Sequence, residues 1–126
     1  MANPFTVGFK GIGQRLVSFL SALTKGTDEE KVVRLHATTP KTVTLPAAEA
    51  KFMGVLKQVD AADGVASVQV EGYVTVPYTG TIPGIGHKEL VANGAGGVKT
   101  PTTPGTGIFY WVVDGDATAG TITFKL

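Results

Sequence analysis

The sequence contains no cysteine, few charged residues and no long apolar run. Without cysteine, neither a disulfide nor a thiolate metal site can form. Charged residues make up 17% of the 126 residues, and the net charge is only +1, which supplies no field that would gather nucleic acid or anionic lipid. No apolar segment approaches the roughly 20 residues that span a bilayer. We therefore expect neither nucleic acid nor a membrane as partner.

The first residues, 1–13, also lack the charged start and apolar core of a signal peptide. We expect a protein that is made in a cytoplasm and is kept there, or is assembled there into something larger.

Residues that could hold a metal ion are few and scattered. The sequence has two histidines, His36 and His87, and a carboxylate such as Glu89 near the second. A metal site needs three or four ligands held together, and nothing in the spacing of these residues indicates one. We predict no metal and no cofactor.

Side chains for catalysis are equally sparse. Two aspartate pairs stand in turn contexts, where aspartate usually caps backbone N–H groups; they are Asp60 with Asp63 and Asp114 with Asp116. No serine lies in a Gly-x-Ser-x-Gly elbow, and no cysteine nucleophile exists. We predict that the protein is not an enzyme.

The sequence is rich in glycine, with 17 in the chain, and in short runs that alternate apolar and polar residues. Residues 66–71 and 73–78 alternate between apolar and polar side chains on either side of Gly72. This alternation is typical of strands with one buried and one wet face, and Gly72 marks a bend or bulge between them. In the first run we expect Ala66, Val68 and Val70 to face inward and Ser67, Gln69 and Glu71 to face solvent.

Further strands are predicted along the rest of the chain. The runs are residues 31–37, with Val33 and Leu35 inward, 41–45, with Val43 and Leu45 inward, 108–113, and 121–126, with Ile122, Phe124 and Leu126 inward. In all we count about seven or eight short strands at intervals near ten residues. The sequence therefore predicts an all-β protein, a small β-barrel or sandwich.

Two segments leave room for a short helix. Residues 14–25 place Leu16, Phe19, Leu20 and Leu23 at helical spacing, but the run is short and permits a strand as well. Residues 47–53 are too short for an independent helix and permit one or two turns.

Two segments of the chain are candidates for contact with a partner, an N-terminal arm and a long loop. Phe5, Val7 and Phe9 alternate in a glycine-rich stretch that permits an edge strand, a frayed terminus or a docked arm. We divide the chain into an N-terminal arm, residues 1–26, and a β-rich domain, residues 27–126. Residues 93–107 are rich in glycine, threonine and proline, so we expect a loop that is mobile or contacts a partner.

The aromatic run Phe109-Tyr110-Trp111 is the one place where a stacking ligand is conceivable. Consecutive strand residues alternate faces, so these three cannot form one platform, and we expect at least one in the core. A barrel that binds a sugar or an oligonucleotide stays open as an alternative, and it requires aromatic residues exposed on one face.

From Lys31 to Leu126, roughly three-quarters of the chain, the order of elements resembles the capsid decoration (cement) proteins of tailed bacteriophages. The resemblance rests on Val32-Val33-Arg34-Leu35, Gly54-Val55-Leu56, Asp63-Gly64, Val68-Gln69-Val70, Gly72, Val74-Thr75-Val76, Gly80-Thr81-Ile82, the step from Gly86 to Leu90, a Gly-rich segment, and Gly120-Thr121-Ile122-Thr123-Phe124. Tyr110-Trp111-Val112-Val113 replaces a Gly-x-Ala-Leu step of the family, and the first 25 residues match none of its motifs.

The resemblance implies a structural virion protein on the outer capsid surface that stabilises the head by clamping adjacent major capsid subunits. It implies a homo-oligomer, with a trimer favoured, that has the major capsid protein as its partner. Phe5, Val7 and Phe9 are then the expected capsid contacts. Another virion component, such as a head-fibre base or a tail protein, remains an alternative.

Overall fold

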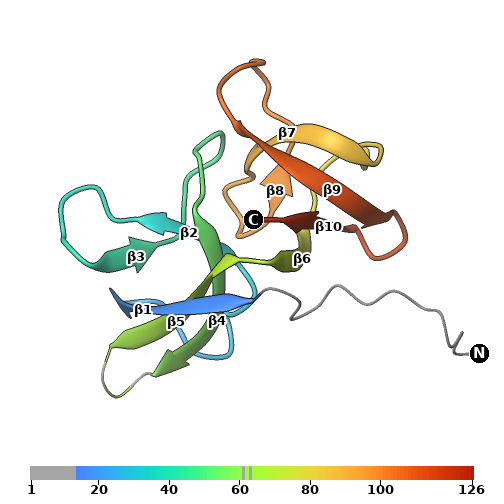
Figure 1. Ribbon diagram of the computed structural model, residues 1–126. Coiled ribbons are helices and arrows are strands. Elements are labelled where there is room, and N and C mark those ends of the chain that lie inside the picture. Colours follow the sequence, from blue (N-terminus) through green and yellow to red (C-terminus); the bar gives the residue numbers. More distant parts are fainter. Residues whose placement is uncertain (1–13, 61, 63) are drawn as a thin grey trace, which may run out of the picture.

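The structure is a computed structural model and describes residues 14–60, 62 and 64–126. These residues form ten strands and no helix, in two sheets (Figure 1). The strands are β1 (Arg15–Ser21), β2 (Val32–Leu35), β3 (Thr42–Thr44), β4 (Gly54–Asp60), β5 (Val65–Glu71), β6 (Tyr73–Pro77), β7 (Gly86–Ala92), β8 (Val98–Lys99), β9 (Ile108–Asp116) and β10 (Thr121–Lys125). The predicted all-β class is confirmed.

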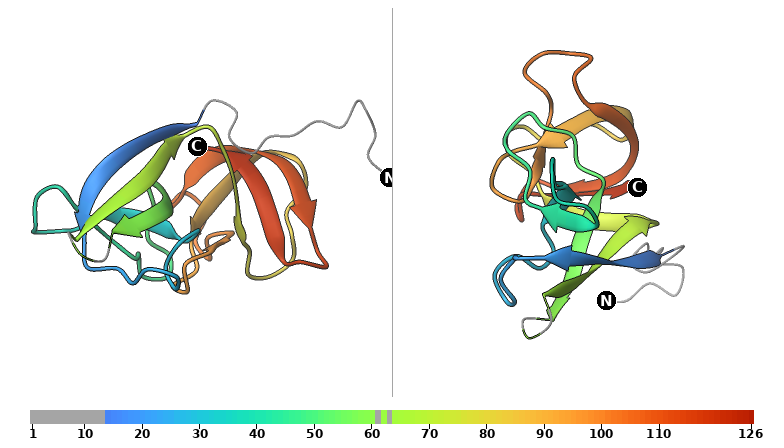
Figure 2. Two further views of the ribbon diagram at one scale, coloured as in Figure 1. Left: turned by 90° about the horizontal axis from the view of Figure 1, so that it is seen from below. Right: turned by 90° about the vertical axis from the view of Figure 1, so that its left-hand side faces the viewer.

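The two sheets follow each other along the chain. Strands β1 to β5 form a closed barrel in the order β1-β3-β2-β4-β5, and the other five form a sheet in the order β6-β10-β9-β7-β8. The two lie side by side, the barrel in blue to green and the second sheet in yellow to red (Figure 2). Gly72, with φ 95°, stands between β5 and β6, so the predicted bend is where the chain passes from one sheet to the other.

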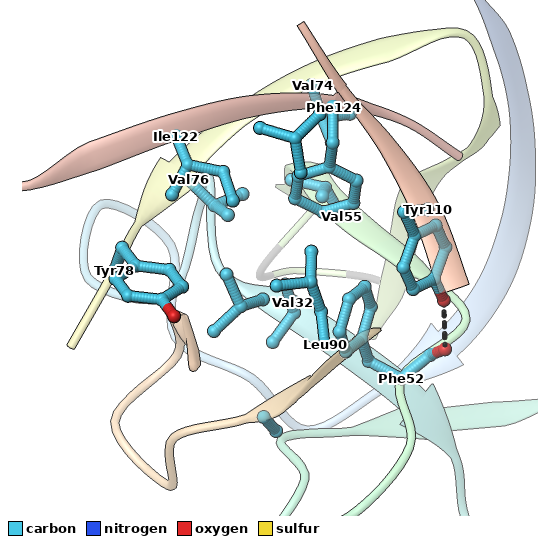
Figure 3. Packing of buried hydrophobic residues seen from close by; sticks show 13 residues of the cluster. Val32, Phe52, Val55, Val74, Val76, Tyr78, Leu90, Tyr110, Ile122 and Phe124 are labelled. Carbon is cyan, nitrogen blue, oxygen red and sulfur yellow. Dashed lines mark hydrogen bonds between the residues drawn. The ribbon is translucent and has the colours of Figure 1, made fainter. Parts of the chain in front are cut away.

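The hydrophobic core has two parts. The smaller fills the barrel and contains Val33, Val43, Leu56, Val59, Ala66 and Val68. The larger joins the barrel to the second sheet (Figure 3) and contains Val32, Phe52, Val55, Val74, Val76, Tyr78, Leu90, Ala92, Val98, Tyr110, Val112, Ile122 and Phe124. Because successive residues of a strand face opposite ways, Val32 enters the larger part and Val33 the smaller.

The structure corrects the prediction that Val33 and Leu35 both face inward. Val33 faces inward as expected, but Leu35 is 50% exposed. β2 ends at Leu35, and only Val32 and Val33 pair with β4. Leu35 pairs only with Val43 of β3 and therefore lies beyond the part of β2 that pairs with β4.

Gln69 corrects a second prediction, because it is buried rather than solvent-facing. Its amide nitrogen donates to the carbonyl oxygens of Glu71 (2.9 Å) and Tyr73 (3.2 Å), and its Oε1 accepts from the amide of Gln14 (3.3 Å). A buried amide needs such partners. Gln69 therefore fastens the crossing from β5 to β6 rather than facing water.

The segments that permitted a helix contain none. Within 14–25, Arg15–Ser21 is a strand that pairs antiparallel with β5 and, at Leu20 and Ser21, parallel with β3. Phe19 packs against the barrel core while Leu16 and Leu20 are exposed. Residues 47–53 form no helix either. β1 falls within the segment predicted as an arm, residues 1–26, whereas Phe5, Val7 and Phe9 lie outside the described residues.

The glycine-rich segment 93–107 is tied to the sheet at several points. The Asn93 side chain accepts from the N–H groups of Ala95 and Gly97 and donates to Thr79. Glu49 accepts from Thr102 N–H, and Glu89 from Gly105 and Gly107 N–H. The segment contains β8, which forms an edge of the second sheet.

The C-terminal strand matches its prediction. Ile122 and Phe124 are fully buried, and Leu126 packs against the larger core. The Leu126 N–H donates to the Gly72 carbonyl at 2.9 Å, which fixes the end of the chain at the junction of the two sheets.

Candidate functional site

The outward face of the second sheet carries a row of large side chains in register. Tyr73 on β6 pairs with Lys125 on β10, Lys125 with Trp111 on β9, and Trp111 with His87 on β7. Residues directly opposite each other on neighbouring strands have adjacent side chains. We call Tyr73, Lys125, Trp111, His87 and the neighbouring Phe109 the aromatic surface.

The rings of this surface contact one another. His87 stacks on Trp111, with centroids 4.8 Å apart and planes 26° apart, and lies 5.0 Å from Phe109 at 39°. Phe109 and Trp111 are two residues apart on β9, so they share a face, and His87 fills the space between them from the next strand. The three rings form one continuous cluster.

This cluster is open to solvent. Phe109 is 54% exposed and Trp111 58%, and Ile85, next to the start of β7, is 73% exposed. Single exposed apolar residues are ordinary, but a contiguous group marks a surface that another molecule covers. Tryptophan is also enriched at the energetic centres of protein interfaces.

The alternation predicted for Phe109-Tyr110-Trp111 is confirmed, because Tyr110 is buried on the opposite face. Its ring stacks on Phe52 at 5.1 Å, and its hydroxyl donates to the Phe52 carbonyl at 3.3 Å (Figure 3). Burial raises the pKa of Tyr110 to about 12. Tyr110 therefore belongs to the core and is not accessible to a ligand.

The histidines considered as metal ligands lie on different sheets. The Nδ1 atom of His36 accepts from the N–H groups of Thr38 and Thr39 just after β2, whereas His87 belongs to the aromatic surface. Across the part of the chain that the structure describes, no group of three or more potential ligands gathers around one point.

The aspartates at turns bond to backbone groups as predicted. Asp116 accepts from Thr118 and Ala119 N–H, and Asp60 from Ala62 N–H. Asp114 accepts from Gly115 N–H. Asp63 lies outside the described residues.

Two other carboxylates have pKa values set by their contacts. The Lys99 ammonium, with the Thr102 N–H, lowers the pKa of Glu49. The Thr24 N–H lowers the pKa of Asp28 against the opposing effect of burial, and Lys31 adds to the lowering. Both carboxylates fasten loops, and neither lies on the aromatic surface.

Within the cluster of stacked rings, His87 is the member that sequence reasoning missed. Its position in a glycine- and proline-rich stretch resembles a turn, and only the register between β7 and β9 places it opposite Trp111. The signal available from sequence was the two-residue separation of Phe109 and Trp111 along a predicted strand. That spacing indicates a shared face but does not reveal the third ring.

No protein-family model matches this chain, and no curated protein matches it either. Among the described residues, no helix has the length and apolar character needed to cross a membrane.

Proposed function

We propose that this protein is a decoration protein of a tailed-bacteriophage virion. In this proposal it binds the outer surface of the capsid, most favourably as a trimer, and stabilises the head by clamping adjacent major capsid subunits. The sequence resemblance supplies the kind of particle. The aromatic surface is the observation that carries the proposal, because it offers a rigid, exposed apolar face for docking on another protein.

The arrangement of this face suits repeated weak contacts. The stacked rings rise from two hydrogen-bonded strands, β9 and β7, so little side-chain or backbone freedom is lost on docking. Many copies on a symmetric shell, each bound at more than one point, would give strong overall attachment from modest single contacts.

The experiment that tests the proposal is co-sedimentation of the purified protein with undecorated phage heads, together with its mass in solution. We expect binding that saturates at a ratio set by the capsid lattice. Replacing the two exposed rings, Phe109→Ser with Trp111→Ser, should weaken binding by at least about tenfold, because aromatic anchors dominate protein interfaces.

The matched control removes two exposed apolar side chains from the other half of the molecule, Leu16→Ser with Leu20→Ser. These leucines have similar exposure, 50% and 48%, and this variant should sediment with heads as the unchanged protein does. Equal binding by both variants would remove the aromatic surface from the interface. A protein that stays in the supernatant would overturn the decoration function.

The predicted capsid contacts Phe5, Val7 and Phe9 are tested separately. Deleting residues 2–12 should leave the domain folded and abolish head binding. Unchanged binding by the truncated protein would refute the role of the arm and leave the aromatic surface as the contact. Locating the protein within the particle would separate a decoration protein from a head-fibre base or tail component.

A ligand-binding role is favoured by one observation, the exposure of Trp111. A sugar or a base would stack on the face of its ring. However, His87 already covers one face of that ring, and Tyr110 is in the core. In a screen of glycans and oligonucleotides, a ligand that quenches Trp111 fluorescence at micromolar concentration would favour this role over docking.

A further inference from the structure

A shallow apolar groove lies between the barrel and the second sheet, on residues that the aromatic surface does not include. Its volume is about 470 Å³, and it is lined by Leu35 at the end of β2, by Phe52 and Met53 before β4, and by Ile108 at the start of β9. Leu35 and Ile108 are 50% and 40% exposed. The groove therefore presents aliphatic side chains that nothing in the described chain covers.

The charged residues that line this groove are both cationic, Arg34 and Lys51. Neither forms an ion pair with any carboxylate of the described residues, where the pairs are Arg15–Glu71, Lys31–Asp28, Lys57–Glu30 and Lys99–Glu49. The Arg34 Nε donates to the Leu35 carbonyl at 3.2 Å, which holds the guanidinium beside the groove.

The acidic residues nearest to these cations in sequence are already paired, and Glu30, four residues before Arg34, pairs with Lys57. Glu49, two residues before Lys51, pairs with Lys99 and accepts from the Thr102 N–H. From Arg34 to Met53 it is also the only acidic residue. The groove thus has a local excess of positive charge although the whole chain is nearly neutral.

We propose that this groove binds an extended acidic segment of a partner protein. An aliphatic side chain of that segment would lie between Leu35 and Ile108, and flanking carboxylates would pair with Arg34 and Lys51. Arginine binds carboxylates through two parallel hydrogen bonds, which adds direction to the charge attraction. A polyanion without apolar groups is disfavoured, because the groove lining between the two cations is mainly hydrocarbon. This proposal is argued from the groove alone and does not depend on the capsid function.

The test is a titration of the full chain, followed by two-dimensional amide NMR, with three probes. These are the blocked peptide Glu-Leu-Asp-Ile-Glu, its counterpart Lys-Leu-Lys-Ile-Lys, and octanoate. We expect the acidic peptide alone to shift the amides of Arg34, Leu35, Lys51, Met53 and Ile108. Its affinity should fall severalfold when NaCl is raised from about 0.01 M to about 0.15 M, because exposed charges are then screened.

Charge reversal gives the decisive comparison. Arg34→Glu with Lys51→Glu should weaken binding of the acidic peptide by at least about tenfold, because attraction becomes repulsion. The same variant should gain affinity for the lysine peptide, which the new carboxylates attract. Lys25→Glu with Lys41→Glu makes the same change in net charge at exposed positions outside the groove lining and should leave the affinity within about twofold. All four of these side chains are exposed, and the amide spectrum of each variant reports its folding.

Three results would overturn the proposal. One is equal binding of both peptides, which would mean that apolar contact alone holds them. Another is shifts that map away from the groove. The third is octanoate binding as tightly as the acidic peptide, which would make the groove a site for small apolar acids.

Discussion

At the scale of single residues, Tyr110 couples the core to pH. Its neutral hydroxyl is buried against the Phe52 carbonyl, and its pKa is raised from 10.0 to about 12. A group whose pKa is higher in the folded than in the unfolded protein adds stability below its unfolded pKa and loses it as pH rises through the folded one. We therefore expect the free energy of unfolding to fall between pH 10 and pH 12, by about 1 kcal/mol for each pH unit.

The variant Tyr110→Phe isolates this effect. It should cost about 1 kcal/mol at neutral pH through the lost hydrogen bond, and it should flatten the decline above pH 10. Urea unfolding from pH 7 to pH 11, followed by circular dichroism, measures both. The partly exposed Tyr73 provides a control, because Tyr73→Phe should leave the decline in place. A parallel decline in wild type and Tyr110→Phe would assign it to other groups.

Single residues also show where sequence reasoning succeeds. Period-two alternation correctly placed Ile122 and Phe124 in the core, and it required one member of the run 109–111 to be buried without saying which, because side-chain direction along a strand is a local property. It failed for Gln69 and Leu35. Whether the outward face of a strand meets water or a second sheet, and how far a neighbouring strand extends, depends on contacts distant in sequence.

At the scale of elements, Glu89 determines the form of the loop between β8 and β9. Its Oε2 accepts from Gly105 N–H at 2.9 Å and from Gly107 N–H at 2.8 Å. Hydrogen bonds to a charged acceptor are the stronger kind. Glu89→Ala should therefore lower the free energy of unfolding by about 1–2 kcal/mol and speed amide exchange at Gly105 and Gly107.

The neighbouring strand residue gives a matched control for this loop. Lys88→Ala changes the adjacent position on β7, for which the structure gives no hydrogen bond to the loop. The free energy of unfolding and the amide exchange of Gly105 and Gly107 should stay at their wild-type values in this variant. Amide exchange at Gly105 and Gly107 that is unchanged in Glu89→Ala would show that other contacts order the loop.

Elements were predictable to different degrees. The strands with clean alternation, such as β6 and β10, were foreseen, whereas residues 14–25 left helix and strand open. Leu16, Phe19, Leu20 and Leu23 satisfy a helical period, but β1 is held by pairing with β5, and this tertiary contact overrides a short local pattern. The role of 93–107 was equally hidden, because the carboxylates that fasten it lie elsewhere in the chain.

At the scale of the whole molecule, the aromatic surface and the groove depend on how two sheets join. The resemblance to decoration proteins suggested a partner, but neither surface could be located from sequence. The aromatic surface needs β7 to pair with β9, and the groove needs the end of β2 and the start of β9 to meet across the two sheets. Composition and alternation predict that such a sheet exists, and they do not predict its register.

The barrel and the second sheet share the larger core. We therefore predict that the two sheets unfold together. Phe52 precedes a barrel strand, yet its ring stacks on Tyr110 and meets Phe124 edge-on at 5.9 Å. Phe52→Ala should lower the free energy of unfolding by about 3–5 kcal/mol, because it leaves a cavity between the two sheets. Fluorescence of Trp111, the only tryptophan, reports the second sheet, and the amide signals of Val59 and Val68 report the barrel.

Val43→Ala tests the same coupling from within the barrel. Val43 belongs only to the smaller core, and its truncation should cost about 2 kcal/mol. If unfolding is a single cooperative transition, this change must shift the urea midpoint seen by Trp111 as far as the midpoint seen by the barrel amides. A Trp111 midpoint that stays in place while the barrel amides lose protection earlier would show two independent units. The groove, which takes side chains from both halves, would then lose its shape before the aromatic surface does.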